Sequence, residues 1–152
     1  VRDLMPNLAD LQKVTFPVEV AFGDVTITAH WAPARVTAEW LRDWAEGTVD
    51  DALVQLVVGW DLTTEEGEEY PLTVEGLKEL PTLFKDSLHR EIMQQRIARA
   101  RHLLAESDVA IAAVAELAGF GDASYLSVVF RRETGENPLA YRRRQRTPSA
   151  AV

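Results

Sequence analysis

Arginine is the residue that determines the chemistry of the C-terminal part of this sequence. After Glu91 the chain has nine Arg, no Lys and six acidic residues, a formal charge of +3. A guanidinium group can bind phosphate through two parallel hydrogen bonds, which a lysine ammonium cannot do. Up to Glu91, seven basic residues stand against eighteen acidic ones, a formal charge of −11. The change of sign predicts two modules with different partners within a chain whose net charge is −8.

The arginines flank a pattern that is typical of two short helices joined by a glycine turn. Apolar residues recur at helical spacing over 111–118, and Gly119 follows as a left-handed C-cap. Asp122 is the predicted N-cap of the next helix, which Gly135 ends, and Asn137-Pro138 begins a last, basic helix. The inward positions of the middle helix are Leu126, Val129 and Phe130, and its outward positions are Ala123, Ser124, Ser127, Val128 and Arg131.

The segment 99–144, "RARHLLAESDVAIAAVAELAGFGDASYLSVVFRRETGENPLAYRRR", resembles the C-terminal helix-turn-helix of the AraC family of transcription regulators. The residues that carry the resemblance are Ile111, Ala115, Gly119-Phe120, Asp122, Ser124-Tyr125, Phe130, Gly135, Pro138 and Tyr141-Arg142. It implies that the helix after the glycine turn enters the major groove of duplex DNA. By position, the implied base-facing residues are Ala123, Ser124, Ser127 and Val128, and the implied phosphate partners are Arg131, Arg132 and Arg142.

This sequence departs from the family pattern in two ways. Val128 stands where many members have a polar residue that reads bases, and valine offers only contact with a thymine methyl group. Members normally have two helix-turn-helix units, whereas the residues before Arg96 show no first unit. One unit with a few phosphate contacts binds DNA weakly, so we expect dimerisation to restore affinity. The alternative is that the segment is only a stable three-helix unit retained for folding.

The residues before Glu91 predict a mixed fold. Two β-rich runs, 14–22 and 25–31, flank Gly23-Asp24 as in a hairpin. Helical spacing predicts a helix over 36–44 and a second one from the N-cap Thr48 to Trp60, then a polar turn over 61–71 and a short helix within 72–81. A long helix should run from about 82 to 106, with a drift of its apolar register near Gln94-Gln95. The predicted fold class is α+β: an N-terminal β-hairpin with helices, followed by an all-α helix-turn-helix module.

A second resemblance covers residues 10–92. The order of a β-rich start, a helix with Trp, the motif WDLT, an acidic turn and the motifs PLT and LP is similar to that of the tail assembly chaperones of long-tailed bacteriophages. The resemblance implies a binding module without catalysis that keeps the tape-measure protein soluble. The predicted domains are an acidic chaperone-like module over 10–92, a helix-turn-helix module over 93–146 and a disordered tail over 147–152. The sequence thus reads as a chimera, natural or designed.

The sequence gives no support for catalysis or for a metal site. The acidic turn lacks the glycine of a calcium-binding loop and has Leu72 where a bidentate Glu is required. His30, His89 and His102 have no ligand spacing, and the chain has no Cys. No phosphate-binding glycine loop or nucleophile motif occurs, and the four Trp fit a small core. We therefore predict a non-enzyme with no metal, cofactor or small-molecule substrate.

The sequence leaves three hypotheses about the binding partner. The leading hypothesis is duplex DNA bound by the C-terminal module, and the second is a phage tail protein held by a chaperone. The third is a host-defence nuclease, inhibited by an acidic surface that imitates nucleic acid and includes Glu65, Glu66, Glu68 and Glu69. A surface rich in carboxylates can also serve solubility alone. No stretch approaches the ~20 apolar residues of a membrane span, and the N-terminus lacks a signal-peptide run, so we expect a cytoplasmic protein without a membrane partner.

Overall fold

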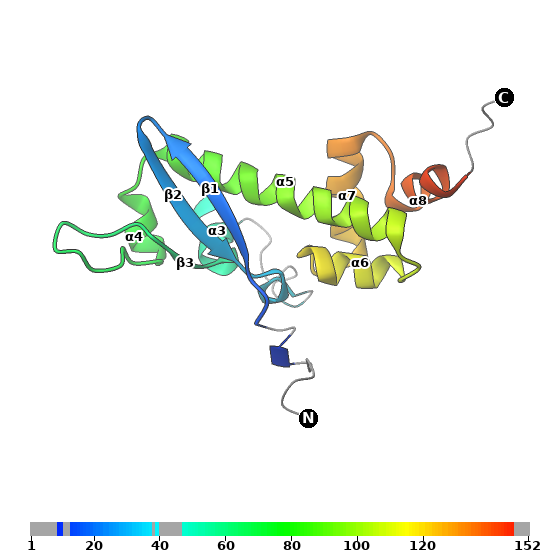
Figure 1. Cartoon of the computed structure of the whole chain (residues 1–152), viewed down its shortest axis with the longest axis horizontal. Coiled ribbons are helices and arrows are strands. Elements are labelled where there is room, and N and C mark those ends of the chain that lie inside the picture. The colour runs from blue at the N-terminus through cyan, green and yellow to red at the C-terminus, as the bar shows by residue number, and fades with distance from the viewer. Residues whose placement is uncertain (1–8, 11–12, 38, 40–46, 148–152) are drawn as a thin grey trace.

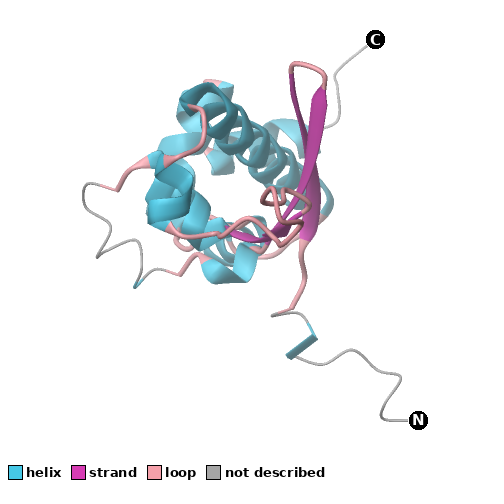
Figure 2. Ribbon diagram, turned by 90° about the vertical axis from the view of Figure 1, so that its left-hand side faces the viewer, coloured by secondary structure: helices cyan, strands magenta, loops and turns pink. Residues whose placement is uncertain are grey.

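The computed structural model describes residues 9–10, 13–37, 39 and 47–147. A small antiparallel sheet and two short helices pack around the first half of one long helix, and three short helices pack around its second half (Figure 1). In the end-on view of Figure 2, the strands lie to one side of the helices. The predicted α+β fold class is confirmed. The predicted helix over 36–44, apart from residues 36, 37 and 39, and the last five residues of the tail lie outside the described residues.

The predicted hairpin is present. Strand β1 (Phe16–Phe22) pairs antiparallel with β2 (Val25–Trp31), with Phe22 opposite Val25. The two-residue connection needs a positive φ, which Gly23 supplies with φ 63°. Alternate residues point inward, so that Val18, Val20, Ile27, Ala29 and Trp31 are buried. The register is therefore fixed by the side chains as well as by the turn.

The prediction that the second helix continues to Trp60 is wrong. Helix α3 (Val49–Leu56) begins at the capping box of Thr48 and Asp51, but strand β3 (Val57–Trp60) follows it directly. β3 pairs antiparallel with β2, which makes a three-stranded sheet in the order β1-β2-β3. The β-branched Val57 and Val58, followed by Gly59, favour an extended chain, and the strand satisfies backbone groups along the free edge of β2. The burial of Leu56, Val57 and Trp60 imitates a helical stripe, because a helix and this helix–strand junction bury the same three residues.

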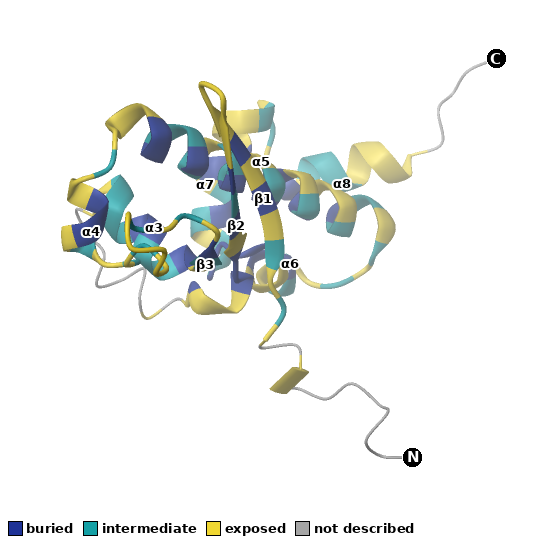
Figure 3. Cartoon of the chain, turned by 60° about the vertical axis from the view of Figure 1, so that its left-hand side comes forward, coloured by how far each residue is buried: buried dark blue, intermediate teal, exposed yellow. Residues whose placement is uncertain are grey.

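A one-turn 3-10 helix η2 (Pro33–Arg35) follows β2, and the acidic turn over residues 61–71 leads to helix α4 (Val74–Lys78), which Thr73 caps. Helix α5 (Thr82–Glu106) then runs for 25 residues and confirms the predicted long helix. Phe84, Leu88 and Ile92 belong to an N-terminal cluster with the sheet, α3 and α4. Ile97, Ala100 and Leu104 belong to a C-terminal cluster with the last three helices. The predicted drift near Gln94-Gln95 is thus the point where α5 changes the face that it buries. The tip of the β1–β2 hairpin and the end of α8 are exposed (Figure 3).

Helices α6 (Ile111–Ala118), α7 (Ala123–Thr134) and α8 (Pro138–Arg146) confirm the predicted C-terminal module. The chain turns by 77° between α6 and α7. The predicted caps are all present: Asp122 and Asn137 accept backbone N–H bonds, and Gly119 and Gly135 have left-handed conformations. Each of these helices is short, so its ends are a large part of its stability.

Candidate nucleic-acid interface

Helix α7 presents one buried and one open face. Leu126, Val129 and Phe130 point into the C-terminal cluster and are at most 1% exposed. On the opposite face Ser124 is exposed, Val128 is 66% exposed, and Ala123 and Ser127 are half-buried. All four residues assigned by resemblance to base contacts thus lie on one accessible side of the helix. Their contact with bases stays a prediction.

The turn before α7 is built around two constraints on Gly119. Its φ is 87°, which favours glycine, and the N–H of Phe120 closes the turn on the Ala115 carbonyl oxygen at 2.7 Å. A Cβ atom at Gly119 would lie 2.9 Å from Cζ3 of Trp31, on the last residue of β2. Phe120 is fully buried in the C-terminal cluster. The N-terminal half of the molecule therefore packs, through Trp31, directly against the turn that precedes α7.

Arg131 and Arg132, at the end of α7, are both exposed. Within the described part of the chain, the Arg131 side chain has no ion pair or hydrogen bond. Arg132 Nε donates a hydrogen bond to Oε1 of the adjacent residue, Glu133, at 3.3 Å. An exposed pair of this kind contributes little and exchanges readily for another anion. Neither arginine is neutralised by the acidic N-terminal half.

Arg142, the third residue assigned to phosphate, already has a bond inside the protein. Its Nε donates to the carbonyl oxygen of Leu104 at 3.2 Å, and its Nη2 atom is buried without a partner. One helical turn later, Arg146 bonds the Ser107 carbonyl and pairs with Asp108. Both arginines therefore satisfy groups at the C-terminal end of α5, where carbonyls lack helical partners. The contact of Arg142 with phosphate stays a prediction, and such a contact would compete with the bond of Arg142 to Leu104.

Three arginines that the sequence did not single out are also accessible. Arg143, on α8, is exposed, and its side chain forms no bond with another described residue. Arg90 and Arg101 line two neighbouring open hollows between α5 and the end of α7. The count of arginines after Glu91 includes Arg101 and Arg143 but not Arg90. The place of Arg90 and Arg101 beside α7 depends on how two distant segments pack.

The larger hollow, about 520 Å³, includes His89 beside Arg90 and Arg132. Burial lowers the pKa of His89, the charges of Arg96 and Arg132 lower it further, and Asp86 opposes them. His89 is therefore neutral at neutral pH and adds no positive charge to this surface. Among the described residues, no group of three or more His, Asp or Glu could hold a metal ion.

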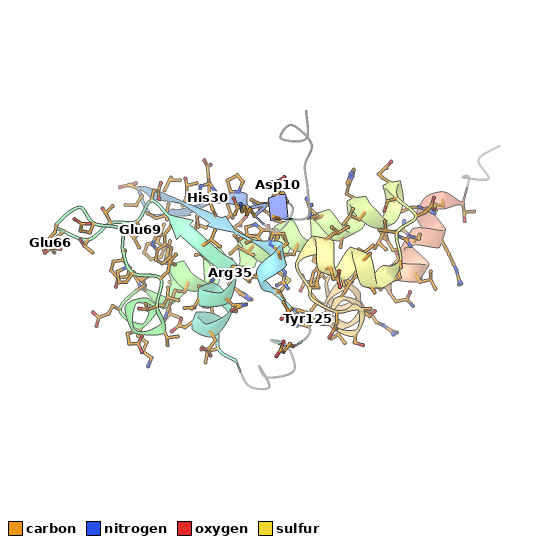
Figure 4. All side chains as sticks on the ribbon, turned by 90° about the horizontal axis from the view of Figure 1, so that it is seen from below. Asp10, His30, Arg35, Glu66, Glu69 and Tyr125 are labelled. Atoms are coloured by element: carbon orange, nitrogen blue, oxygen red, sulfur yellow. The ribbon has the colours of Figure 1, made fainter. Side chains whose placement is uncertain are left out.

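The acidic turn and the basic helix α8 lie at opposite ends of the molecule. The acidic turn projects beyond β3 and α4, at the end farthest from α8 (Figure 1), and Glu66 and Glu69 mark it in Figure 4. Tyr125, in the first turn of α7, lies in the other half of the same view. In the described chain, no single helix has both the length and the apolar character of a membrane span; α6 and α7 meet those criteria only together, as a bent pair.

Comparison with known families gives a match over residues 79–144, to a family described as a helix-turn-helix domain. The C-terminal part of this chain is similar to helix-turn-helix domains of the AraC type. It is similar to the HTH-type transcriptional activator RhaR of Enterobacter sp. (strain 638), with 38% identity over 60 residues, which cover 40% of this chain and 21% of that protein. It is also similar to the activator RhaS of Salmonella arizonae, with 33% identity over 106 residues, 61% of this chain and 37% of that protein.

The chain thus spans between about a fifth and somewhat more than a third of the length of these relatives. No solved structure matches. The matched helix-turn-helix region begins at residue 79 and includes all of α5, whereas the predicted boundary of the module was residue 93. The resemblance of the C-terminal part to AraC regulators is confirmed, and that of residues 10–92 to phage tail chaperones stays a prediction.

Proposed function

We propose that this protein binds duplex DNA through the outer face of α7 and regulates transcription. The observation that carries the proposal is the open face of Ser124 and Val128, which continues into the unpaired Arg131, on a helix that lies away from the acidic turn (Figure 1). The names of the relatives, transcriptional activators, support the same function. In this proposal Ala123, Ser124, Ser127 and Val128 face base edges, while Arg131 and Arg132 hold phosphates.

Arg142 has a secondary part in this proposal. Arg142 Nε keeps its hydrogen bond to the Leu104 carbonyl oxygen and thereby orients α8. In this orientation Arg143 presents an unbonded guanidinium to the phosphate backbone of the duplex. Three phosphate contacts by one unit place the affinity near the non-specific range of roughly 10⁻⁴ to 10⁻⁶ M. We therefore propose that a second copy of the chain supplies the second unit on a repeated half-site.

The test begins with a selection of duplexes from a random pool by the wild-type chain, followed by binding measurements on the enriched duplex. Between about 50 and 200 mM salt, the logarithm of the affinity should fall linearly with the logarithm of salt, with a slope near −0.9 per phosphate contact. Arg131→Gln should reduce the slope by about 0.9 and weaken all sequences alike. Val128→Ala should instead change the preference at one base position. Lys78→Gln, in α4, is the control and should leave the slope unchanged.

Failure of the wild-type chain to enrich any duplex, with no binding at high micromolar protein in about 50 mM salt, would rule out the proposal. Binding with a normal slope in Arg131→Gln would reject the assigned orientation of α7 while keeping DNA as the partner.

The acidic turn supports a second candidate, the binding of a basic protein partner. Glu65, Glu66, Glu68 and Glu69 are all exposed, and none forms an ion pair with another described residue. The partner classes already named are a phage tape-measure protein and a host-defence nuclease. Replacing the four Glu by Gln should abolish capture of such a partner, and raising salt should weaken it in the wild type. Capture that survives both changes would remove the acidic turn as the binding surface.

A further inference from the structure

Arg96 is the most deeply buried arginine among the described residues, and it has no carboxylate partner. It is 3% exposed, and no ion pair reaches it within the described chain. Its Nη2 donates to the carbonyl oxygen of Gly119 at 2.5 Å, while its Nε is buried without a hydrogen bond. Burying an unpaired cation is costly, and a hydrophobic side chain of similar volume is often as stable or more stable at such a place. Its presence therefore calls for a reason other than stability.

The surroundings of Arg96 supply that reason. The guanidinium carbon lies 4.4 Å from the ring centre of Phe120 and 5.7 Å from that of Tyr125. Gly119 and Phe120 form the turn between α6 and α7, and Tyr125 is in the first turn of α7. One side chain on α5 thus contacts the end of α6, the turn and the start of the helix proposed to enter DNA.

The forces at this contact are directional. A cation over aromatic faces and a charge-assisted bond to a carbonyl each fix an orientation, which apolar packing alone does not. Burial lowers the pKa of the Arg96 guanidinium, and Tyr125 opposes that shift. The group remains charged at neutral pH, because a guanidinium keeps its proton in proteins. The charge therefore holds Tyr125, Phe120 and the Gly119 carbonyl in one arrangement.

We propose that Arg96 is a positioning residue: through Gly119, Phe120 and Tyr125 it sets the orientation of α7 relative to α5 without itself touching DNA. The proposal rests on the proposed function, because α7 must be the helix that binds. The proposal predicts that the stability of the fold and the affinity for DNA change independently in Arg96 variants. Replacement of Arg96 should leave the fold intact, or even stabilise it, and still weaken DNA binding.

The experiment compares Arg96→Met, Arg96→Lys and the matched control Arg99→Met in the full chain. Arg99 lies one turn further along α5, donates to the Leu117 carbonyl and lies over the Phe16 ring, but has no contact with Phe120 or Tyr125. Both Met variants remove one positive charge from α5, so they share any general electrostatic loss. The probe is the duplex enriched by the wild-type chain, measured together with thermal unfolding and amide hydrogen exchange of residues 119–126.

For Arg96→Met we expect an unchanged or raised melting temperature, roughly tenfold weaker DNA binding, equivalent to about 1.4 kcal/mol, and faster exchange over 119–126. The salt slope should stay at the wild-type value, because no phosphate contact is lost. Arg96→Lys should recover part of the affinity, since an ammonium keeps one bond to Gly119. Arg99→Met should bind within about twofold of the wild type.

Two outcomes would overturn the inference. Wild-type affinity and exchange in Arg96→Met would show that the charge positions nothing. Unfolding of both Arg96 variants would show that the residue is needed for stability, contrary to the proposal. If the wild-type chain binds no duplex, the proposed function fails, and the exchange of residues 119–126 still decides whether Arg96 orders the turn.

Discussion

The two halves of α5 contact two different kinds of core. The N-terminal cluster is large and aromatic, with Trp31, Trp60 and Phe84 packed between a sheet and helices. The C-terminal cluster is built on small residues, such as Ala100, Ala115 and Ala118, which let α6 approach α5 closely. The N-terminal half ends in an acidic turn, and the C-terminal half ends in exposed arginines. The comparison indicates that the two regions differ both in the packing of their cores and in the charge that they present to solvent, and that the outer face of α7 is open.

Contact between the two clusters occurs through polar bonds along α5. Trp31 Nε1 donates to Gln95 Oε1 at 2.7 Å, and Gln95 Nε2 donates to the Pro17 carbonyl at 3.0 Å. Arg99 adds its contact with the Phe16 ring at 4.3 Å. These bonds join the hairpin to the middle of α5, next to the turn at Gly119. The two modules are therefore docked.

The largest expected effect comes from emptying either cluster. Leu88→Ala and Leu104→Ala each remove a fully buried side chain and should lower the free energy of unfolding by about 2–5 kcal/mol. Because α5 is continuous, we expect one cooperative unfolding transition in each variant, measured by circular dichroism at two wavelengths. Two separate transitions would show that the clusters fold independently, against the docking described above.

A second comparison tests the contact of the hairpin with the turn. Gly119→Ala and Gly135→Ala both place a side chain at φ near +87°, but only at Gly119 would the new Cβ meet Trp31 and Pro33. We expect a loss of about 1–2 kcal/mol for Gly135→Ala from backbone strain and a loss of about 2–4 kcal/mol for Gly119→Ala. Urea titration measures both. Equal losses of unfolding free energy in the two variants would mean that Trp31 and Pro33 move away from the new Cβ atom at no energetic cost.

A third prediction concerns the opposite ends of the molecule. Replacing Glu65, Glu66, Glu68 and Glu69 by Gln changes the formal charge of the chain by four units, from −8 to −4. If the acidic turn lies away from bound DNA, association with DNA should accelerate only modestly, by about two- to fivefold at low salt, and not at all near 1 M salt, where screening is strong. Stopped-flow anisotropy measures the rates. A much larger increase at moderate salt would place the acidic turn beside the duplex.

The smallest effect is expected at His89, which lines the larger hollow between α5 and the end of α7. Its pKa is lowered in the folded state, so the folded protein binds this proton less readily than the unfolded chain does. The stability associated with neutral His89 is present above the unfolded pKa, near 6.5, and is lost as the pH falls through the folded value. His89→Gln should therefore reduce the loss of melting temperature between neutral and mildly acidic pH. His102→Gln, on the exposed side of α5, should leave that loss unchanged.

Sequence reasoning predicted what depends on local signals. The caps Thr48, Asp122 and Asn137 are short-range features, and they correctly predicted where α3, α7 and α8 begin. It failed at Val57–Trp60, because the edge of β2 that recruits this strand is formed by residues far earlier in the chain. Periodicity alone could not distinguish the two outcomes.

The outward face of α7 was predictable for the same reason, since helical geometry alone separates Val128 from Phe130. The internal bond of Arg142 was not, because its partner, Leu104, lies 38 residues away. The burial of Arg96 was equally hidden, because "QQRIAR" reads as a polar helix surface until Phe120 packs over it. The sequence thus shows where the arginines occur along the chain, and only the packing shows which of their guanidinium groups are accessible to a partner.

The continuity of α5 has a practical consequence for anyone who dissects this protein. A fragment that starts at residue 93 would begin in the middle of a helix, leaving Met93 and Ile97 at a frayed end and Gln95 without the indole of Trp31. Such a fragment should be poorly soluble, whatever its affinity for a partner. A shortened version intended to work alone should retain all 25 residues of α5, together with apolar substitutes for the surface that the hairpin now covers.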